Sequence, residues 1–233
     1  MKTMKFLSLS TLAFMSAMTI LSSCGKASEP KNQAEDKDHD EPSKIEVTLQ
    51  EGTLPEGTDT AKDIWAKDFK ATASDKQVFT AEYSEEGKAT IGNPVSLKSG
   101  VWYQMKITLF NEAGKNLNSE FFDPQEMSMH QFFFIPFGPK SDKNPDKTLI
   151  DYKYGDINTQ TNQYTTTPLG FTGYIKVLNS EVTPIQVQIL LPHVAPPASK
   201  LDKNGNPYPF NSPNDNILDD IDMNVKMPIN VIQ

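Results

Sequence analysis

The fold class follows most directly from IDMNVKMPINV, residues 221–231 of the chain. Its large apolar residues occupy every second position, and polar residues or a proline fill the positions between them. Successive side chains of a β-strand point to opposite faces, so this alternation predicts a strand with one buried and one exposed face. Pro228 lacks a backbone N–H, which predicts an edge position or a bulge where it occurs.

Six other segments have strand character. They alternate clearly at residues 45–49, 101–109 and 185–191, and further strands are predicted at 78–83, 130–137 and 171–178. Clusters of Gly, Pro, Asn and Asp separate them, as expected for turns. Beyond the first 23 residues, no stretch keeps a helical apolar stripe for three turns. We therefore predict an all-β domain over residues 45–233, an immunoglobulin-like β-sandwich, with a small β-barrel as the alternative.

The amino terminus has the three regions of a secretory signal. Lys2 and Lys5 are followed by an apolar run over residues 6–20, which is shorter than the roughly 20 residues that a spanning helix needs. Leu21-Ser22-Ser23-Cys24 then resembles the lipobox of bacterial lipoproteins. The resemblance implies that residues 1–23 are removed and that Cys24 carries the lipid. It also implies an outer-membrane location, on the periplasmic face or at the cell surface.

Residues 24–44 are predicted to form an acidic, disordered tether between the lipid and the domain. From Gly25 to about Lys44 no apolar residue is larger than alanine, so the segment cannot offset its ordering entropy by burial. His39 lies inside this segment and is expected to be exposed to solvent.

Composition excludes several classes of function. The chain has 22 basic residues, all lysine, and a net charge of −8. An acidic chain without arginine is a poor ligand for nucleic acid. Cys24 is the only cysteine, so no disulfide, thiol nucleophile or zinc–thiolate site remains once it is lipidated. No serine elbow, phosphate loop or paired-histidine helix motif is present, and we predict a protein that is not an enzyme.

Two histidines of the domain are the strongest candidates for binding chemistry. His130 opens an aromatic strand and His193 ends another, and if these strands are neighbours the two imidazoles converge at one rim of the sandwich. Asp123 and Glu126 lie shortly before His130. Imidazoles with a carboxylate suit zinc, copper or iron, and a pair of axial imidazoles suits haem. The alternative is that each histidine caps a strand end and bonds a backbone carbonyl.

A family resemblance adds to this prediction. Leu109-Phe110-Asn111-Glu112, then His130-Gln131-Phe132-Phe133-Phe134, and much later a strand ending in His193, resemble small Bacteroidetes-type lipoproteins found beside TonB-dependent outer-membrane receptors. The likeness covers roughly residues 90–233. It implies an accessory protein that captures a nutrient for such a receptor.

The leading hypothesis is therefore a membrane-anchored, ligand-binding lipoprotein that captures a metal or a metal-containing nutrient. A surface structural or adhesive module that binds glycan or a host protein is the alternative, and a hydrolase with two converging carboxylates is a third. The glycan hypothesis needs exposed aromatic residues, and its candidates are Trp102, Phe110, Tyr152, Tyr154, Tyr164 and Tyr174. The spacing of oxygen-bearing residues over 202–206 allows either a calcium loop or a simple Asn-Gly turn.

Overall fold

The structure is a computed structural model that describes residues 39–55, 68–83, 89–141, 143–158, 161–165 and 167–233. The predicted signal peptide (residues 1–23), Cys24 and the tether up to residue 38 lie outside the described residues. Within the described part of the chain, no helix has the length and apolarity required to cross a bilayer. A compact unit spans Asp38–Gln233.

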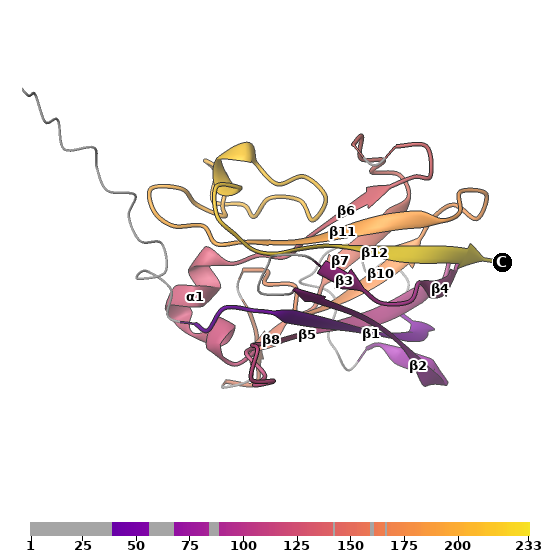
Figure 1. Cartoon of the computed structure of the whole chain (residues 1–233), viewed down its shortest axis with the longest axis horizontal. Helices are drawn as coiled ribbons and strands as arrows, with labels where there is room; N and C mark the ends of the chain where they lie inside the picture. Colours follow the sequence, from indigo (N-terminus) through magenta and orange to yellow (C-terminus); the bar gives the residue numbers. More distant parts are fainter. Residues whose placement is uncertain (1–38, 56–67, 84–88, 142, 159–160, 166) are drawn as a thin grey trace, which may run out of the picture. The chain divides into compact units, whose positions relative to one another are not determined.

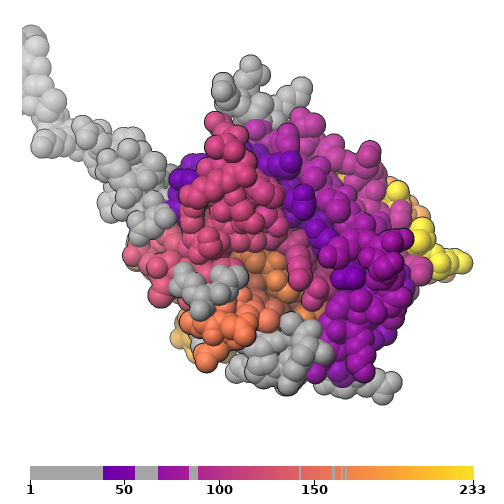
Figure 2. Space-filling model, turned by 90° about the horizontal axis from the view of Figure 1, so that it is seen from below, coloured from indigo at the N-terminus to yellow at the C-terminus, as the bar shows by residue number. Residues whose placement is uncertain are grey.

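Two β-sheets make up this unit (Figure 1). The first has six strands in the order β3-β2-β1-β5-β10-β7, and neighbouring strands are antiparallel. Its strands are β1 (Lys44–Thr53), β2 (Lys70–Tyr83), β3 (Ala89–Ile91), β5 (Trp102–Phe110), β7 (Ile150–Tyr154) and β10 (Thr172–Val177). The indigo-to-magenta part of the chain, which includes β1 and β2, covers one side of the face seen in Figure 2.

The second sheet has four strands in the order β4-β12-β11-β6. They are β4 (Val95–Lys98), β6 (Phe133–Phe137), β11 (Ile185–Pro192) and β12 (Ile221–Ile232). β12 pairs in antiparallel fashion with β11 and in parallel with β4. The remaining elements are short: β8 (Ile157–Asn158), β9 (Gln163–Tyr164), helix α1 (Pro124–Met129), and the 3-10 turns η3 (Glu120–Phe122) and η4 (Asp215–Ile217).

The predicted all-β sandwich is confirmed, and the alternating segments form its strands. One face of each alternating strand is buried between the sheets. In β1 the buried residues Ile45, Val47 and Leu49 alternate with half-exposed neighbours, as the period-two pattern predicts. Burial of such apolar side chains supplies the main driving force for folding.

Two local predictions differ from the structure. The strand predicted at residues 130–137 begins only at Phe133, because helix α1 comes before it, ends at Met129 and has His130 as its C-cap. Pro228 lies in β12, which is an interior strand, so the predicted edge position is wrong. The proline is tolerated there because β4 pairs with β12 only from Ile229 onward, one residue beyond Pro228.

Strand β6 explains the aromatic run in the sequence. All five of its residues are buried, because both faces of this strand are covered. Phe134 packs into the core between the sheets. Phe133, Ile135 and Phe137 join a second apolar cluster on the other side, with Leu190, Val194 and Ile217. The chain between β11 and β12 supplies two members of that cluster.

We expect Ile189→Ala to destabilise the fold strongly. Ile189 is fully buried in β11, opposite Val225 of β12 and Phe134 of β6. Removing three buried carbons from such a site costs about 2–5 kcal/mol of unfolding free energy. Urea unfolding followed by circular dichroism measures the loss. Gln186→Ala in the same strand is the control, because this side chain is exposed, and an equal loss in both variants would contradict the assigned register.

Candidate metal centre

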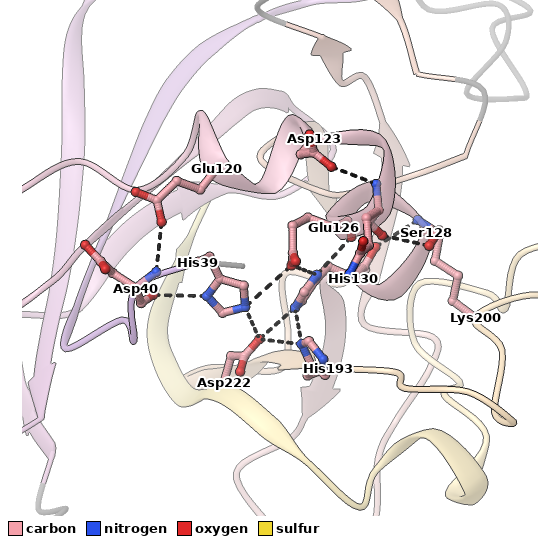
Figure 3. Close-up of polar contacts among 11 residues, drawn as sticks. His39, Asp40, Glu120, Asp123, Glu126, Ser128, His130, His193, Lys200 and Asp222 are labelled. Carbon is pink, nitrogen blue, oxygen red and sulfur yellow. Dashed lines mark hydrogen bonds and ion pairs between the residues drawn. The ribbon is translucent and has the colours of Figure 1, made fainter. Parts of the chain in front are cut away.

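Five titratable side chains from four parts of the chain meet at the end of the sandwich where α1 lies (Figure 1). Glu126 is in α1, and His130 is the residue that ends this helix. His193 follows β11 directly, and Asp222 is the second residue of β12. His39 precedes β1. Figure 3 shows these five side chains pointing toward one another.

Helix α1 sets the spacing of the first pair. Asp123 accepts a hydrogen bond from the Gln125 backbone N–H (3.0 Å), and Pro124 is the first helical residue, which is a favourable N-terminus for a helix. The His130 backbone N–H closes the helix by donating to the Glu126 carbonyl (3.1 Å). Residues four apart lie on one helical face, so Glu126 and His130 project to the same side.

The backbone also fixes His193 beside His130. The two histidines form an isolated antiparallel bridge, and Val194 N–H donates to the Met129 carbonyl (2.9 Å). The His193 backbone N–H donates to the Asp220 carbonyl (3.1 Å), which ties it to the residues that precede β12. As a result, His193 Nδ1 lies 3.0 Å from His130 Nε2.

The carboxylates complete the cluster. Asp222 Oδ2 lies 2.8 Å from His130 Nε2 and 4.0 Å from His193 Nδ1. His39 Nε2 lies 3.5 Å from Asp222 Oδ2 and 3.7 Å from Glu126 Oε2. The side chains of His39, Glu126, His130 and Asp222 have no solvent exposure, and His193 has 2%.

Two of the imidazoles face hydrogen-bond acceptors at both ring nitrogens. His130 Nδ1 is 2.9 Å from the Glu126 carbonyl, while its Nε2 faces the Asp222 carboxylate. His39 Nδ1 is 3.0 Å from the Asp40 carbonyl, while its Nε2 faces both carboxylates. A carbonyl only accepts, so each Nδ1 carries a proton. Each Nε2 then needs a second proton or a cation between itself and the carboxylate oxygens.

The formal charge of the cluster also requires an added proton or a cation. With three neutral imidazoles the buried cluster has a formal charge of −2, one for each carboxylate. Uncompensated charge in a protein interior is strongly unfavourable, and buried charges are paired or bind metals. A divalent cation would neutralise the site completely.

The donor atoms are gathered almost closely enough for one first-row ion. Metal–nitrogen and metal–oxygen bonds of about 2.0–2.1 Å place neighbouring ligand atoms about 2.9 Å apart in an octahedron and about 3.3 Å apart in a tetrahedron. The four ligand atoms of His39, Glu126, His130 and His193 all lie within 4.8 Å of one another, so small side-chain movements would bring them to these separations. The Nδ1–carbonyl contacts of His39 and His130 are the outer-shell bonds that orient ligating imidazoles in metal proteins.

The predicted alternative of haem does not fit this geometry. Axial imidazoles lie on opposite faces of the macrocycle, with their nitrogens about 4 Å apart across the iron. His130 Nε2 and His193 Nδ1 are 3.0 Å apart, and their ring centroids are 4.7 Å apart. No macrocycle fits between them.

The structure brings together three of the four predicted ligands, namely Glu126, His130 and His193. Asp123 stays outside the cluster, because its carboxylate caps α1. The expectation that His39 is exposed to solvent is wrong: it is 7% exposed, and its ring packs 4.4 Å from that of Phe121.

Sequence reasoning also missed the fifth member, Asp222. The alternation of β12 assigns Asp222 to the exposed face, yet it is buried, as is its neighbour Met223. The pairing of β11 with β12 shifts register between Leu191 and Pro192, opposite this point. Such an irregularity re-aims side chains near the end of a strand.

A buried lysine supports the backbone of the site. Lys200 Nζ donates to the carbonyls of His130 (2.8 Å) and Pro168 (3.0 Å). Burial lowers the pKa of Lys200 to about 7, although the nearby carboxylate of Asp156 partly opposes this shift. Through these two hydrogen bonds the lysine holds the peptide at His130 against the one at Pro168.

Two of the predicted glycan-platform tyrosines and the predicted calcium loop have structural roles. Tyr152 and Tyr174 are buried, so they are unavailable as a glycan platform. The Asp202 carboxylate accepts hydrogen bonds from the backbone N–H groups of Asn204 and Asn206, which makes residues 202–206 a turn closed by its own side chain.

Comparison of the chain with protein-family models, with curated proteins and with solved structures finds no match. The resemblance to Bacteroidetes-type lipoproteins therefore stays a prediction.

In the metal-free protein we expect stability to fall as pH rises above about 6.5. Burial lowers the pKa of His39, but its contacts with Asp222, the Asp40 carbonyl and Glu126 raise the pKa by a larger amount. The net pKa of His39 therefore lies above 6.5. Protonated His39 thus stabilises the fold below the unfolded-state pKa, and this contribution is lost as pH rises through the folded-state pKa. Chemical unfolding in the presence of a chelator at several pH values measures it.

The control is His39→Gln, which cannot titrate and should lack this decline. Lys200 contributes the opposite slope above pH 7, because its folded-state pKa is depressed. Only the difference between the wild type and His39→Gln therefore isolates His39. Parallel curves for the two proteins would contradict the expectation.

Proposed function

We propose that this protein is a lipid-anchored, non-enzymatic binding protein that captures a divalent first-row transition-metal ion for an outer-membrane receptor. The observation that carries the proposal is the buried cluster of His39, Glu126, His130, His193 and Asp222. Three imidazole nitrogens and two carboxylates are the donor types that such ions select.

The chemistry of the donor atoms narrows the choice of metal ion. Calcium prefers all-oxygen sites, and copper(I) prefers soft sulfur ligands, so neither suits this set. The formal charge of −2 matches a divalent ion, and zinc, iron(II) and copper(II) all accept imidazole with carboxylate. The two imidazole nitrogens of His130 and His193, 3.0 Å apart, are at a separation that neighbouring ligands on one such ion adopt.

The burial of the cluster supports binding rather than catalysis. A catalytic metal keeps an open coordination position for water or substrate. Here five side chains converge and none has more than 2% solvent exposure. A bare ion fits such a site, whereas a metal-containing nutrient of larger size does not.

The anchoring part of the proposal rests on the sequence. The charged start, apolar run and Leu-Ser-Ser-Cys ending of residues 21–24 carry the resemblance to a lipobox. The receptor partner rests on the resemblance of residues 90–233 to lipoproteins found beside TonB-dependent receptors. The close approach of His130 and His193 favours metal capture over the adhesive alternative, which needs no such convergence.

We expect the purified protein to bind Zn²⁺ and the double variant His130→Ala/His193→Ala to lose this binding. Loss of an outer-shell partner alone costs about 10–100-fold in metal affinity, so removal of two ligands should cost more than about 100-fold. Isothermal titration with zinc ion as the only added metal measures the affinity.

Asp123→Asn is the matched control for this titration. Asparagine can still cap α1, and residue 123 lies outside the cluster, so its affinity should equal that of the wild type. Equal zinc affinity in the wild type and the double histidine variant would overturn the proposed metal site.

We expect Cys24→Ser to abolish lipid attachment and to release the protein from the membrane fraction. A thioether-linked diacylglyceryl group needs the cysteine sulfur, and serine does not supply it. Intact-mass spectrometry and fractionation of the producing cells measure the two effects. An unmodified wild-type Cys24, or a membrane-bound Cys24→Ser protein, would contradict the predicted anchor.

A further inference from the structure

The five ligands are not held equally firmly. Glu126 and His130 belong to α1 and its end, His193 is tied by backbone hydrogen bonds on both sides, and Asp222 lies in the interior strand β12. His39 belongs to no helix or strand. It lies at the start of the five residues before β1, which we call the leading segment (residues 39–43).

The two ends of the leading segment are attached differently. At Ser43 the backbone joins the sheet, because Ser43 N–H donates to the Phe110 carbonyl (2.9 Å) and the Ser43 carbonyl accepts from Tyr83 N–H (2.7 Å). Nearer to His39, contacts that involve side chains replace these backbone-to-backbone hydrogen bonds. Within the described residues, no backbone hydrogen bond ties His39 to the domain.

An exposed ionic network, which we call the clamp, holds Asp40. Its backbone N–H donates to Glu120 Oε2 (2.8 Å), and its carboxylate binds Lys115 Nζ (3.1 Å) and Asn111 Nδ2 (3.1 Å). Lys115 also pairs with Glu120 Oε1 (2.6 Å). The contacts with Lys115 lower the pKa of Asp40, as expected for a stabilised carboxylate. Lys115 and Asp40 are about half exposed, and exposed ion pairs contribute little to stability.

A buried ion can enter or leave only if some part of the structure moves. Movement of α1, β11 or β12 would break backbone hydrogen bonds and sheet pairing. Movement of the leading segment breaks the weak clamp, the His39–Phe121 ring contact and the His39 bond to the ion. It is the least costly way to expose the site.

We infer that the leading segment is the gate of the metal site, that His39 is its detachable ligand, and that the bound ion fixes this segment on the domain. This inference rests on the proposed metal binding and adds its regulation. Because the ion binds the docked segment more tightly than the undocked one, docking and metal binding strengthen each other by the same factor. Metal is retained while the segment is docked and is released when it lifts.

The position of the gate gives it a further role. His39 comes 15 residues after Cys24, the predicted site of lipid attachment. The chain that connects anchor and domain thus enters the domain through the metal site. A receptor that displaces the leading segment would release the ion without disturbing the other four ligands.

The test compares rates of metal release. Zinc-loaded wild type, His39→Ala and Lys115→Met are mixed with excess chelator, and zinc loss is followed by stopped flow. Lys115→Met weakens the clamp without touching a ligand, so release should accelerate about two- to fivefold, the range expected for an exposed ionic network. His39→Ala should release zinc more than about tenfold faster. Lys140→Met, a change at an exposed lysine outside the clamp, should leave the rate unchanged.

Hydrogen exchange monitored by mass spectrometry measures directly whether the leading segment is docked on the domain. Zinc should protect the amides of Asp40 and Glu41 in the wild type and give them no added protection in His39→Ala; Pro42 has no N–H, and the Ser43 N–H is already bonded to the Phe110 carbonyl. If zinc binds but both variants release it at the wild-type rate, or if zinc gives no added protection at Asp40 and Glu41, the gate is overturned while the metal site stands. If the wild type binds no zinc, the proposed function itself fails.

Discussion

The placement of two carboxylates in a solvent-inaccessible end of a β-sandwich is the constraint on which the rest of this structure depends. Glu126 and Asp222 have no exposed side-chain surface, and both face imidazole nitrogens. An interior of this kind tolerates negative charge only when a proton or a metal ion compensates it. The short helix before β6, the bridge between His130 and His193 and the lysine behind His130 all serve to hold electron-rich atoms in one place.

Most of the fold was predictable from the sequence because one simple rule governs it. Strands that are half buried alternate, and the segments around residues 45, 103, 187 and 225 do so without ambiguity. Helix α1 was missed, although Asp123, Pro124 and Glu126 are the residue types of a helix start. Its six residues are too few to show a helical period. The position of Pro228 was predicted wrongly because proline removes a sheet hydrogen bond on only one side of its strand. The sequence of β12 does not show how far β4 extends along that side.

The candidate site was predictable only in part. His130, His193 and Glu126 were found because histidine is scarce in this chain and because strand ends can meet at one rim. His39 was missed because its neighbours in the sequence are polar, and a low apolar content indicates disorder. The burial of His39 is a tertiary effect that depends on Phe121 and on the two distant carboxylates. Asp222 was missed because local strand irregularity overrides alternation, and no sequence signal marks that irregularity.

The parallel pairing of β12 with β4 has a consequence for how the molecule is made. Strand β12 lies between β4 and β11, so the second sheet cannot close until residues 221–232 have been synthesised and have inserted. Contacts between positions so distant in the chain form slowly. Asp222 belongs to β12, so the cluster of buried histidines and carboxylates is completed only when this strand inserts, late in folding.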